Sequence, residues 1–372
     1  MLTDAHATVL RLINQSGPLS RTELVGHLGV SKASMSALAA DLMERGMLTE
    51  AEAVYGGGRP SIRLALQPSS AFFVGASLAG ERFQLCVADL GGDVTAASSV
   101  PAGDDPRSVA EAIGREVGRL IEADGVDRSR VAGIGLSVPG LVDSAAGVCV
   151  RSTLLGWRDV PIGTMVGAAT GLATFVENDA NALVLGQHLF GALRGSRACT
   201  MIAVADGIGC GHIINGELHR GHRGGAGEIA HATIAPGGLP CKCGKRGCLD
   251  TLASTPAVAN AAREAGLPGD FTALDAAAAR GDQAAITILH HAGAALGLAI
   301  AQQIQSLDPE HILVALADGP LDGLYARVLR QTVEANVMPG GGQTQLSIIA
   351  LDADAWAVGA AGVAAGRAFF RR

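Results

Sequence analysis

Three cysteines lie close together in the second half of the chain, and a histidine precedes them. They are Cys241, Cys243 and Cys248, and His231 comes ten residues before the first. Thiolate sulfur and imidazole nitrogen are ligands of tetrahedral Zn²⁺, and structural sites use four such ligands. The alternative is a group of buried thiols or a disulfide, which a reducing compartment disfavours. We therefore predict a structural zinc ion, Zn²⁺, with no position open for a catalytic water.

A second polar pair, Asn178 and Asp179, follows an apolar run at 173–176 and begins a helical stretch. Polar residues at the carboxyl end of a strand face the crevice in which α/β proteins hold ligands. A carboxylate there can accept a hydrogen bond or a proton from a hydroxyl group. The alternative is that one of the two residues only caps the helix. From these residues alone, both interpretations stay open.

The first 66 residues have the pattern of a DNA-binding fold. The stretch Ser20-Arg-Thr-Glu23 predicts a capping box at the start of a short helix, and Ser31 predicts the cap of a longer one. Two strands are expected at 47–54 and 61–66. A short helix, a turn, a longer helix and a two-stranded wing are typical of a winged helix-turn-helix. The alternative is a three-helix module that binds proteins.

In this fold, DNA contacts are expected at the start of the longer helix and at the tip of the wing. Small hydroxyls and a lysine can reach base edges and phosphates there, and an arginine can enter the minor groove. The candidate residues are Ser31, Lys32, Ser34, Ser36 and Arg59. The net charge of −7 disfavours binding of DNA through bulk charge, and residues 1–66 hold six basic and six acidic residues. Operator DNA must therefore be contacted by this neutral segment.

From residue 71 onward, the pattern is that of an α/β protein. Apolar runs of strand length alternate with helical stretches, and aromatic residues make up only 3% of the chain. A short polar linker is expected at 67–70. The apolar stretch 284–307 has histidines and glutamines along one face, so it predicts a core helix and no membrane span. The first residues lack the pattern of a signal peptide, and we expect a cytoplasmic protein with no membrane partner.

Taken together, these motifs resemble the ROK family of bacterial repressors, open-reading-frame proteins and sugar kinases. The matching stretches are Gly133–Asp143, Glu177–Ala182 and Gly207–Ser254, the last with Glu-x-x-His and Cys-x-Cys-Gly-x-x-Gly-Cys at the family's spacing. The resemblance covers essentially the whole chain, because the family's repressors usually carry an N-terminal winged helix. It implies an α/β core of actin/hexokinase-like (ribonuclease H-like) fold, with a sugar cleft between two lobes.

The resemblance also implies domain bounds. They are a winged helix-turn-helix DNA-binding domain at 1–66, a first α/β lobe at 67–186, and a second lobe with the zinc knuckle at 187–372. The C-terminal helix of the second stretch is expected to pack back on the first lobe.

Residue by residue, the resemblance assigns a sugar site. Asn178, Glu228 and His231 match residues that bind the sugar, and Asp179 matches the base that deprotonates the sugar hydroxyl in the kinases. His231 also matches a zinc ligand, along with the three cysteines. Asp250 stands where the family more often has Glu, so a shorter contact to the sugar is expected.

The departures from the family fall on the nucleotide side. The first phosphate loop, Asp-x-Gly-Gly-Thr in the family, is Ser77-Leu-Ala-Gly-Glu81 here. The acidic residue is lost, one glycine gains a methyl group, and Glu81 places a carboxylate at the end of the loop. Such a charge beside polyphosphate costs on the order of a few kcal/mol. Asp206 replaces the usual Thr of the second loop, and Ala315-Leu316-Ala317 replaces a glycine triplet near adenosine. All three departures fall on ATP binding, although Mg²⁺ could offset the charge of Asp206.

These observations predict a sugar-responsive transcriptional repressor, a homodimer or dimer of dimers, with a sugar or sugar phosphate as its effector and no kinase activity. The alternative is an active ATP-dependent sugar kinase, of hexokinase or N-acetylhexosamine kinase type, with a regulatory DNA-binding arm. A third hypothesis, a ligand-free vestigial core, conflicts with the retained Asn178, Asp179, Glu228 and His231.

Overall fold

The computed structural model of the chain describes residues 2–54, 61–339 and 343–370. These residues form two compact units, Met1–Gly195 with Asp354–Arg372, and Ser196–Ala353. The first unit holds both the N-terminal segment (residues 2–66) and an α/β lobe, called the first lobe below. The second unit is one continuous stretch of chain.

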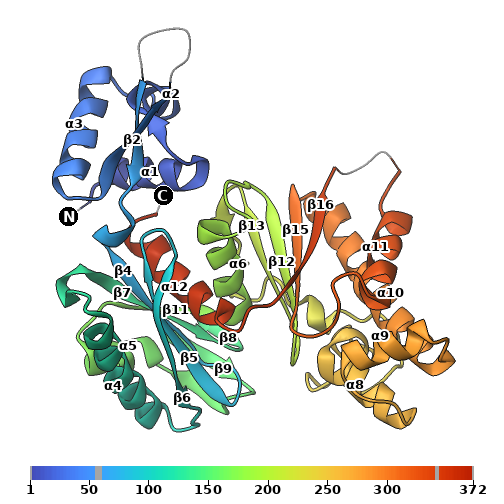
Figure 1. The fold of residues 1–372 in the computed structure, drawn as a ribbon. Coiled ribbons are helices and arrows are strands. Elements are labelled where there is room, and N and C mark those ends of the chain that lie inside the picture. Colours follow the sequence, from blue (N-terminus) through green and yellow to red (C-terminus); the bar gives the residue numbers. More distant parts are fainter. Residues whose placement is uncertain (1, 55–60, 340–342, 371–372) are drawn as a thin grey trace. The chain divides into compact units, whose positions relative to one another are not determined.

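The N-terminal segment has three helices and a small antiparallel sheet (Figure 1). The helices are α1 (Asp4–Ser16), α2 (Arg21–Leu28) and α3 (Lys32–Glu44), and the strands are β1 (Leu19–Ser20), β3 (Ser61–Leu66) and β2 (Leu48–Val54) in spatial order. Ser20 and Glu23 form the predicted capping box, and Ser31 caps α3 by accepting a hydrogen bond from the Ser34 amide. Arg59 lies outside the described residues.

The N-terminal segment is joined to the first lobe by packing as well as by the chain. Residues 67–70, expected to be a polar linker, contain a 3₁₀ helix, η1 (Pro68–Ser70). The Gln67 amide donates to the Met47 carbonyl, and the Leu90 amide donates to the Pro68 carbonyl. Apolar side chains of α1, α2 and α3 share one core with the first lobe, including Phe369 and Phe370. The linker is therefore held on both sides.

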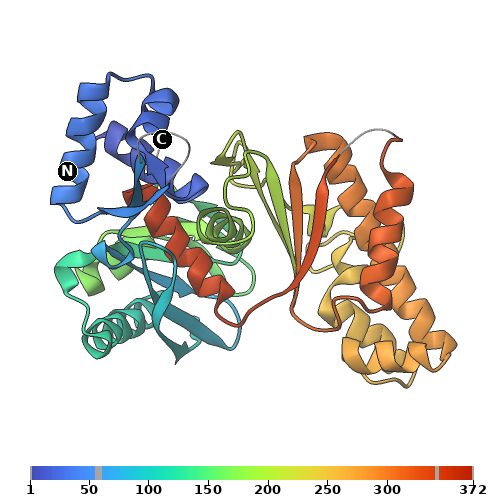
Figure 2. The same ribbon diagram turned by 45° about the horizontal axis from the view of Figure 1, so that its top comes forward.

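The first lobe is built on a five-stranded sheet with helices on both faces (Figure 2). In spatial order its strands are β11 (Thr174–Asn178), β7 (Val131–Val138), β4 (Phe72–Ser77), β5 (Arg82–Asp89) and β6 (Val94–Pro101). Strands β4, β5 and β6 are antiparallel, and β7 and β11 run parallel to β4. A smaller sheet contains β8 (Leu141–Asp143), β9 (Val148–Ser152) and β10 (Trp157–Val160), and η2 (Arg128–Arg130) precedes β7.

The alternation of side chains along β4 explains why both faces of this sheet are covered. Phe72 and Val74 point to one face and pack with α4 (Pro106–Asp124) and α5 (Ile162–Thr170), while Phe73 points to the other. That second face is covered by α6 (Asp179–Phe190) and α12 (Ala355–Ala368).

Helix α12 lies directly on the sheet because the strands present glycines to it. A Cβ on Gly75 or Gly135 would lie 1.9 Å or 1.8 Å from a backbone oxygen of α12. On its other side, α12 meets α6, where a Cβ on Gly186 would lie 2.7 Å from the Gly359 Cα. Sheet, α12 and α6 are thus packed backbone against backbone, so one cannot shift without the others.

The second unit repeats the sheet topology of the first lobe. Its strands are β14 (Glu217–Leu218), β13 (Ile208–Ile214), β12 (Cys199–Val204), β15 (His311–Leu316) and β16 (Gln345–Ala350) in spatial order. The first three are antiparallel, and β15 and β16 run parallel to β12. The helices are η3 (Ile229–His231), α7 (Asp250–Ala253), α8 (Thr255–Glu264), α9 (Phe271–Ala279), α10 (Gln283–Leu307) and α11 (Leu324–Asn336). The repeated topology confirms the two similar α/β lobes expected from the sequence.

Helix α10 is the one helix of the described residues that is long and apolar enough to cross a membrane. In the structure, 56% of the most apolar 18-residue stretch of α10 is buried, and α10 packs against α9 and α11. It has the features of the core helix that the sequence predicts.

Candidate metal centre and ligand-binding residues

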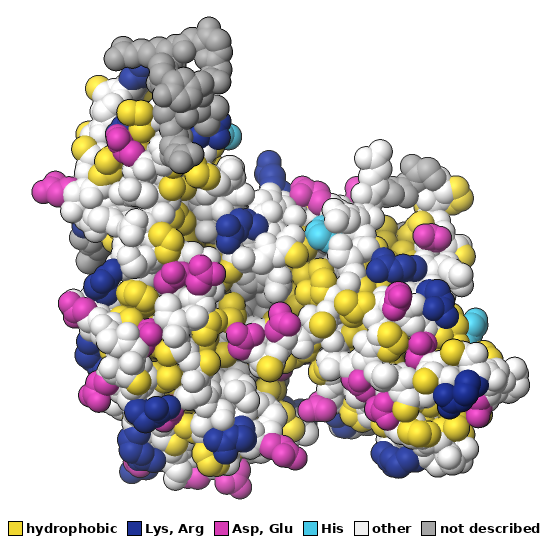
Figure 3. Space-filling model, in the orientation of Figure 1, with side chains coloured by type: hydrophobic (Ala, Val, Ile, Leu, Met, Phe, Trp, Pro, Cys, Tyr) yellow, Lys and Arg dark blue, Asp and Glu magenta, His cyan; other side chains and the backbone are white. Residues whose placement is uncertain are grey.

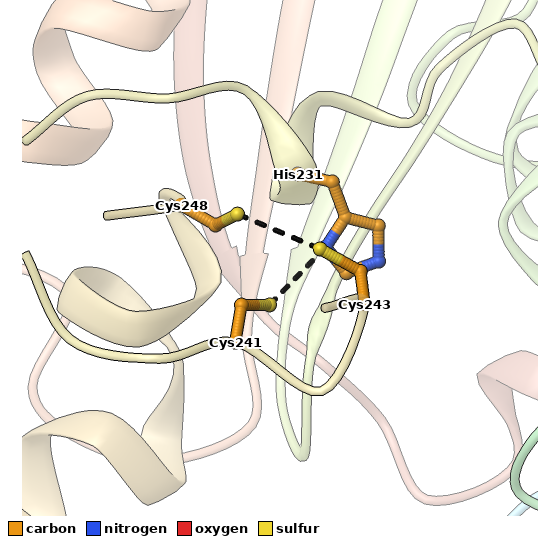
Figure 4. A group of neighbouring side chains, drawn as sticks. All are labelled: His231, Cys241, Cys243 and Cys248. Atoms are coloured by element: carbon orange, nitrogen blue, oxygen red, sulfur yellow. Dashed lines mark hydrogen bonds between the residues drawn. The ribbon is translucent and has the colours of Figure 1, made fainter. Parts of the chain in front are cut away.

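His231, Cys241, Cys243 and Cys248 converge in the second unit (Figure 4). Their ligand atoms all lie within 4.8 Å of one another. The Cys241 Sγ is 3.5 Å from the His231 Nδ1, and the Cys243 Sγ is 3.7 Å from the Cys248 Sγ. Two sulfurs bound at about 2.3 Å to a tetrahedral zinc ion are about 3.8 Å apart. The four residues therefore form a group with the composition and spacing of a metal site.

Tight turns bring these four residues together in a segment that we call the knuckle (residues 231–248). Its chain is closed by two isolated antiparallel bridges, Thr233 to Cys248 and Pro240 to Arg246. Gly247 has a φ of 70°, and a Cβ there would lie 1.6 Å from the Ala235 carbonyl oxygen. A side chain at this position would force the turn apart and separate the cysteines.

The thiols of the knuckle differ in how readily they ionise. The backbone amide of Lys245 lowers the pKa of the Cys243 thiol, whereas burial raises the pKa of Cys248 to about 11. Metals bind the thiolate form, so binding of a metal must remove a proton from Cys248.

His231 has different partners on its two ring nitrogens. Nδ1 faces the Cys241 sulfur, and Nε2 lies 3.9 Å from Glu228 Oε2. The Lys245 ammonium donates to the His231 carbonyl at 2.6 Å and so fixes the backbone of the histidine. Glu228 and His231, both implied by the resemblance to bind sugar, are thus neighbours. The Nδ1 edge of the imidazole faces the cysteines of the knuckle.

Asp250 is held by groups of its own unit. Its Oδ1 accepts a hydrogen bond from the Ile208 amide at 3.2 Å, and its Oδ2 lies 3.4 Å from the Lys242 ammonium. Ile208 belongs to the glycine loop (residues 206–209), so Asp250 links this loop to the knuckle. Sequence reasoning did not single out Lys242, although its place between two predicted zinc ligands was a signal.

A cavity of about 450 Å³ opens beside these residues in the second unit. Its lining includes Asp206, Lys242 and Asp250, and the rest comes from the knuckle and from α7, α8 and α10. The space beside the carboxyl end of β15 is different. Phe271 and Tyr325 pack edge to face at 5.1 Å and, with Leu316, leave no room there for a water molecule.

Asn178 and Asp179 lie in the first unit, where β11 ends and α6 begins. Asn178 Oδ1 accepts from the Asn181 amide at 3.1 Å, so Asn178 caps the helix. Its Nδ2 donates to the Gly140 carbonyl and to Asp179 Oδ1, at 3.0 Å and 2.9 Å. Asn178 therefore fits the helix-cap interpretation, and it also orients Asp179 at the carboxyl end of the strand.

The predicted DNA-contacting residues of α3 share an exposed surface. Ser31, Lys32, Ser34 and Ser36 are all exposed, whereas Met35 is buried against the N-terminal segment. On the face of the molecule drawn in Figure 3, Lys and Arg side chains are interspersed with Asp and Glu, as the mixed charge of the sequence suggests.

Comparison with known proteins places the chain in a family. A model described as the ROK family matches residues 73–366. The chain belongs to the ROK family. A second model, described as the MarR family, matches residues 2–59. This ROK protein therefore carries a MarR-type winged helix DNA-binding domain in front of an actin/hexokinase-like core, as its sequence led us to expect.

Relatives of this ROK protein include a kinase and repressors. Glucokinase of Halalkalibacterium halodurans is 30% identical over 289 residues, which are 73% of this chain and 88% of that protein. The DNA-binding transcriptional repressor Mlc of Escherichia coli is 25% identical over 355 residues, 92% and 87% of the two chains. A crystal structure of a ROK family transcriptional regulator, a homologue of E. coli Mlc, matches with a TM-score of 0.79 at 27% identity and covers 98% of this chain and 96% of that one.

Residues 77–81, which the resemblance matches to the family's first phosphate loop, lie where β4 turns into β5. Leu78 is fully buried there and Glu81 is exposed. The Leu78 amide donates to the Ser137 carbonyl at 2.9 Å, so this amide is used within the sheet.

Proposed function

We propose that this ROK protein is a sugar-responsive transcriptional repressor of carbohydrate-metabolism genes that no longer acts as a kinase. The observation that carries the proposal is the fusion of a MarR-type winged helix to a ROK core. The exposed start of α3, with Lys32 and Ser34, gives that domain a surface able to enter the major groove of DNA. Ser31, Ser36 and Arg59 complete the proposed contacts.

In this proposal a sugar or sugar phosphate is bound by Asn178, Asp179, Glu228 and His231. Carboxylates and an imidazole can each hold a sugar hydroxyl by a hydrogen bond. Asp250 belongs to the same site, where it also holds Lys242 and the glycine loop. Asp179, the vestigial base, accepts a hydrogen bond from a sugar hydroxyl here and does not remove the proton of that hydroxyl.

We propose that the metal of the knuckle is zinc with a structural role. Four protein ligands fill a tetrahedral shell, so the ion holds the chain in place and supplies no reactive water. His231 would bind it through Nδ1, with Nε2 kept on the side of Glu228. By holding one edge of the His231 imidazole, the ion would thus orient the other edge of that ring toward the sugar.

Loss of kinase activity is supported by the places where phosphates and adenosine would bind. Phosphoryl transfer depends mainly on positioning and neutralising the phosphates, and Glu81 adds a negative charge there. Beside β15, Leu316, Phe271 and Tyr325 fill the space. The second candidate function, a sugar kinase with a regulatory DNA-binding arm, is favoured by the retained Asp179 and by the 30% identity to a glucokinase.

The proposal includes a homodimer, or a dimer of dimers, in the cytoplasm. Two recognition helices about 34–36 Å apart would enter successive major grooves of a palindromic operator. Light scattering of the full chain with and without operator measures this assembly, and a monomer on DNA would contradict it.

The test uses an operator selected from a random duplex pool with the full chain. Relatives named glucokinase, N-acetylglucosamine repressor and xylose repressor define the panel: D-glucose, N-acetyl-D-glucosamine, D-xylose and phosphorylated forms of these sugars. We expect one of them to release the operator in gel shifts, and no transfer of radiolabelled phosphate from ATP above background. In Asp179→Asn, sugar binding should weaken, operator affinity should stay near wild type and release should be lost. Turnover of ATP with sugar would favour the kinase instead.

A further inference from the structure

Asn14 of the N-terminal segment forms a hydrogen bond with the end of a helix in the first lobe. Its Nδ2 donates to the Leu189 carbonyl oxygen at 2.8 Å, between residues 175 positions apart in the chain. The Asn14 side chain is only 3% exposed. A buried amide that lost its partner would be destabilising, so this contact fixes the position of α1.

The acceptor of this bond is one of the four carbonyls that a helix leaves without intrahelical partners at its C-terminus. Helix α6 ends at Phe190, and its final carbonyls are satisfied in different ways. The Gly191 amide donates to the Gln187 carbonyl, and Arg194 donates to that of Phe190 at 3.2 Å. For Leu189 the donor comes from the DNA-binding part of the chain. Asn14 is thus a C-terminal cap supplied by another domain.

The same helix begins at the proposed sugar site. Asn178 caps the N-terminus of α6, and Asp179 is its first residue. Twelve residues of helix span about 18 Å. Helix α6 is packed backbone against backbone on α12 at Gly186 and Gly359, and rigid secondary elements of this kind can carry coupling between distant sites.

A second contact lies where the chain leaves the first unit. Gly195 is the last residue of that unit before Ser196, and a Cβ on it would lie 3.2 Å from the Gln15 carbonyl oxygen. The end of α1 is therefore next to both the C-terminus of α6 and one of the two points at which the chain passes between the units.

From these contacts we propose that Asn14 is a positioning residue that couples the sugar site to the DNA-binding domain through α6. The proposal rests on the proposed function and names its route of regulation. A sugar bound at Asp179 acts on α6, and Asn14 makes α1 follow the end of that helix. The held 67–70 segment would follow this movement and not provide a free hinge.

The test compares Asn14→Leu with Arg194→Leu. The first removes the donor from the N-terminal segment and keeps a branched side chain with the same number of heavy atoms. The second removes a side-chain donor from the same end of α6 without touching that segment, so it is the matched control. Operator affinity is measured with and without the releasing sugar, alongside sugar affinity and thermal unfolding.

We expect sugar affinity and sugar-free operator affinity of Asn14→Leu to stay within about threefold of wild type. The factor by which sugar weakens operator binding should fall by about 3- to 30-fold, the range for residues that carry coupling. Arg194→Leu should keep the wild-type factor. An unchanged factor in Asn14→Leu, or an equal loss in both variants, would overturn the proposal.

A second measurement needs neither a sugar nor a folded variant. Coupling is reciprocal, so operator binding to the wild-type chain should slow hydrogen exchange in residues 179–190. Unchanged exchange there would refute the role of Asn14 even if Asn14→Leu did not fold. If no sugar of the panel released the wild-type operator while exchange still slowed, the proposed effector would be wrong, and the coupling between the operator and α6 would stand.

Discussion

The ammonium of Lys242 lies 3.4 Å from Asp250 Oδ2, while the other oxygen of that carboxylate accepts a hydrogen bond from the Ile208 amide. A single side chain from α7 thus ties the knuckle to the glycine loop. The two interactions differ in surroundings, because the Lys242 side chain is 60% exposed and that of Asp250 only 10%.

We predict that the hydrogen bond matters more than the ion pair. Asp250→Ala leaves the Ile208 amide without its acceptor, and the free energy of unfolding should fall by about 1–3 kcal/mol. Lys242→Met removes a solvent-exposed charge and should cost at most about 1 kcal/mol. Urea unfolding of both variants and of the double variant measures the difference. Equal losses in the two single variants would contradict the ranking.

We predict one zinc ion per chain, held by the knuckle. Elemental analysis of protein purified without chelator should find it, and Cys243→Ser should lose it together with thermal stability and sugar affinity. Cys199→Ala is the control, since this thiol is buried in β12 away from the knuckle and should keep the metal. A full zinc content in Cys243→Ser would mean that this thiol is not a ligand.

Stability should fall in acid because of His212. Burial lowers the pKa of His212 to about 4, and the positive charge of His219 contributes in the same direction. In the unfolded chain the histidine pKa is about 6.5, so as the pH falls the unfolded state binds this proton before the folded state does. The contribution of His212 to the free energy of unfolding is therefore lost between about pH 6.5 and 4. The loss from this group is roughly 3 kcal/mol over that window.

Urea unfolding of wild type and His212→Leu at pH 7.5, 6 and 5 provides the measurement. Only the difference in slope between the two proteins is compared, so proton uptake by the knuckle cancels. His212→Leu also removes the partner of Thr200, which lowers stability at every pH but does not alter the slope. Parallel pH dependences would show that His212 does not cause the loss.

The serines at the start of α3 should differ in how much each contributes to stability and to DNA binding. Ser31→Ala removes the helix cap and should destabilise by about 1 kcal/mol. Ser36 donates only to the Lys32 carbonyl, so Ser36→Ala should leave stability unchanged. Ser34→Glu should abolish operator binding by repelling phosphate while sugar affinity stays at the wild-type value.

Lys32→Ala tests the charge of the same surface. It should lower the slope of log affinity against log salt concentration by about one, as expected for the loss of one phosphate contact. Fluorescence anisotropy over a salt series measures this, and an unchanged slope would place Lys32 away from the phosphates.

Sequence reasoning succeeded where the determining contacts are local. The cap at Ser31, the capping box at Ser20 and the grouping of Cys241, Cys243 and Cys248 all depend on residues a few positions apart. It missed the bond from Asn14 to Leu189, because nothing near Asn14 in the chain indicates its partner. Lys242 was missed for a different reason, because its local signal, a place between Cys241 and Cys243, was not used.

Asp250 shows the same limit within a recognised motif. Its position in the pattern was clear, but its carboxylate turned out to be held by the Ile208 amide and Lys242. A side chain one methylene shorter than Glu can be satisfied by neighbours that only the folded chain brings near. The pairing of Phe271 with Tyr325 beside β15 was equally hidden, since the two lie on different helices.

Because α12 packs against Gly75 and Gly135, the sheet of the first lobe receives this helix only at the end of synthesis. The ribosome makes β4 and β7 early, then the whole of Ser196–Ala353, and only afterwards the helix that covers them. The second unit is one continuous stretch of chain, so it can fold before α12 has been made and has packed on the sheet of the first unit. A transcript that ends before the codon for residue 354 would therefore leave the nascent DNA-binding segment attached to an apolar sheet that lacks one of its two covering helices, a product suited to proteolysis more than to occupying an operator.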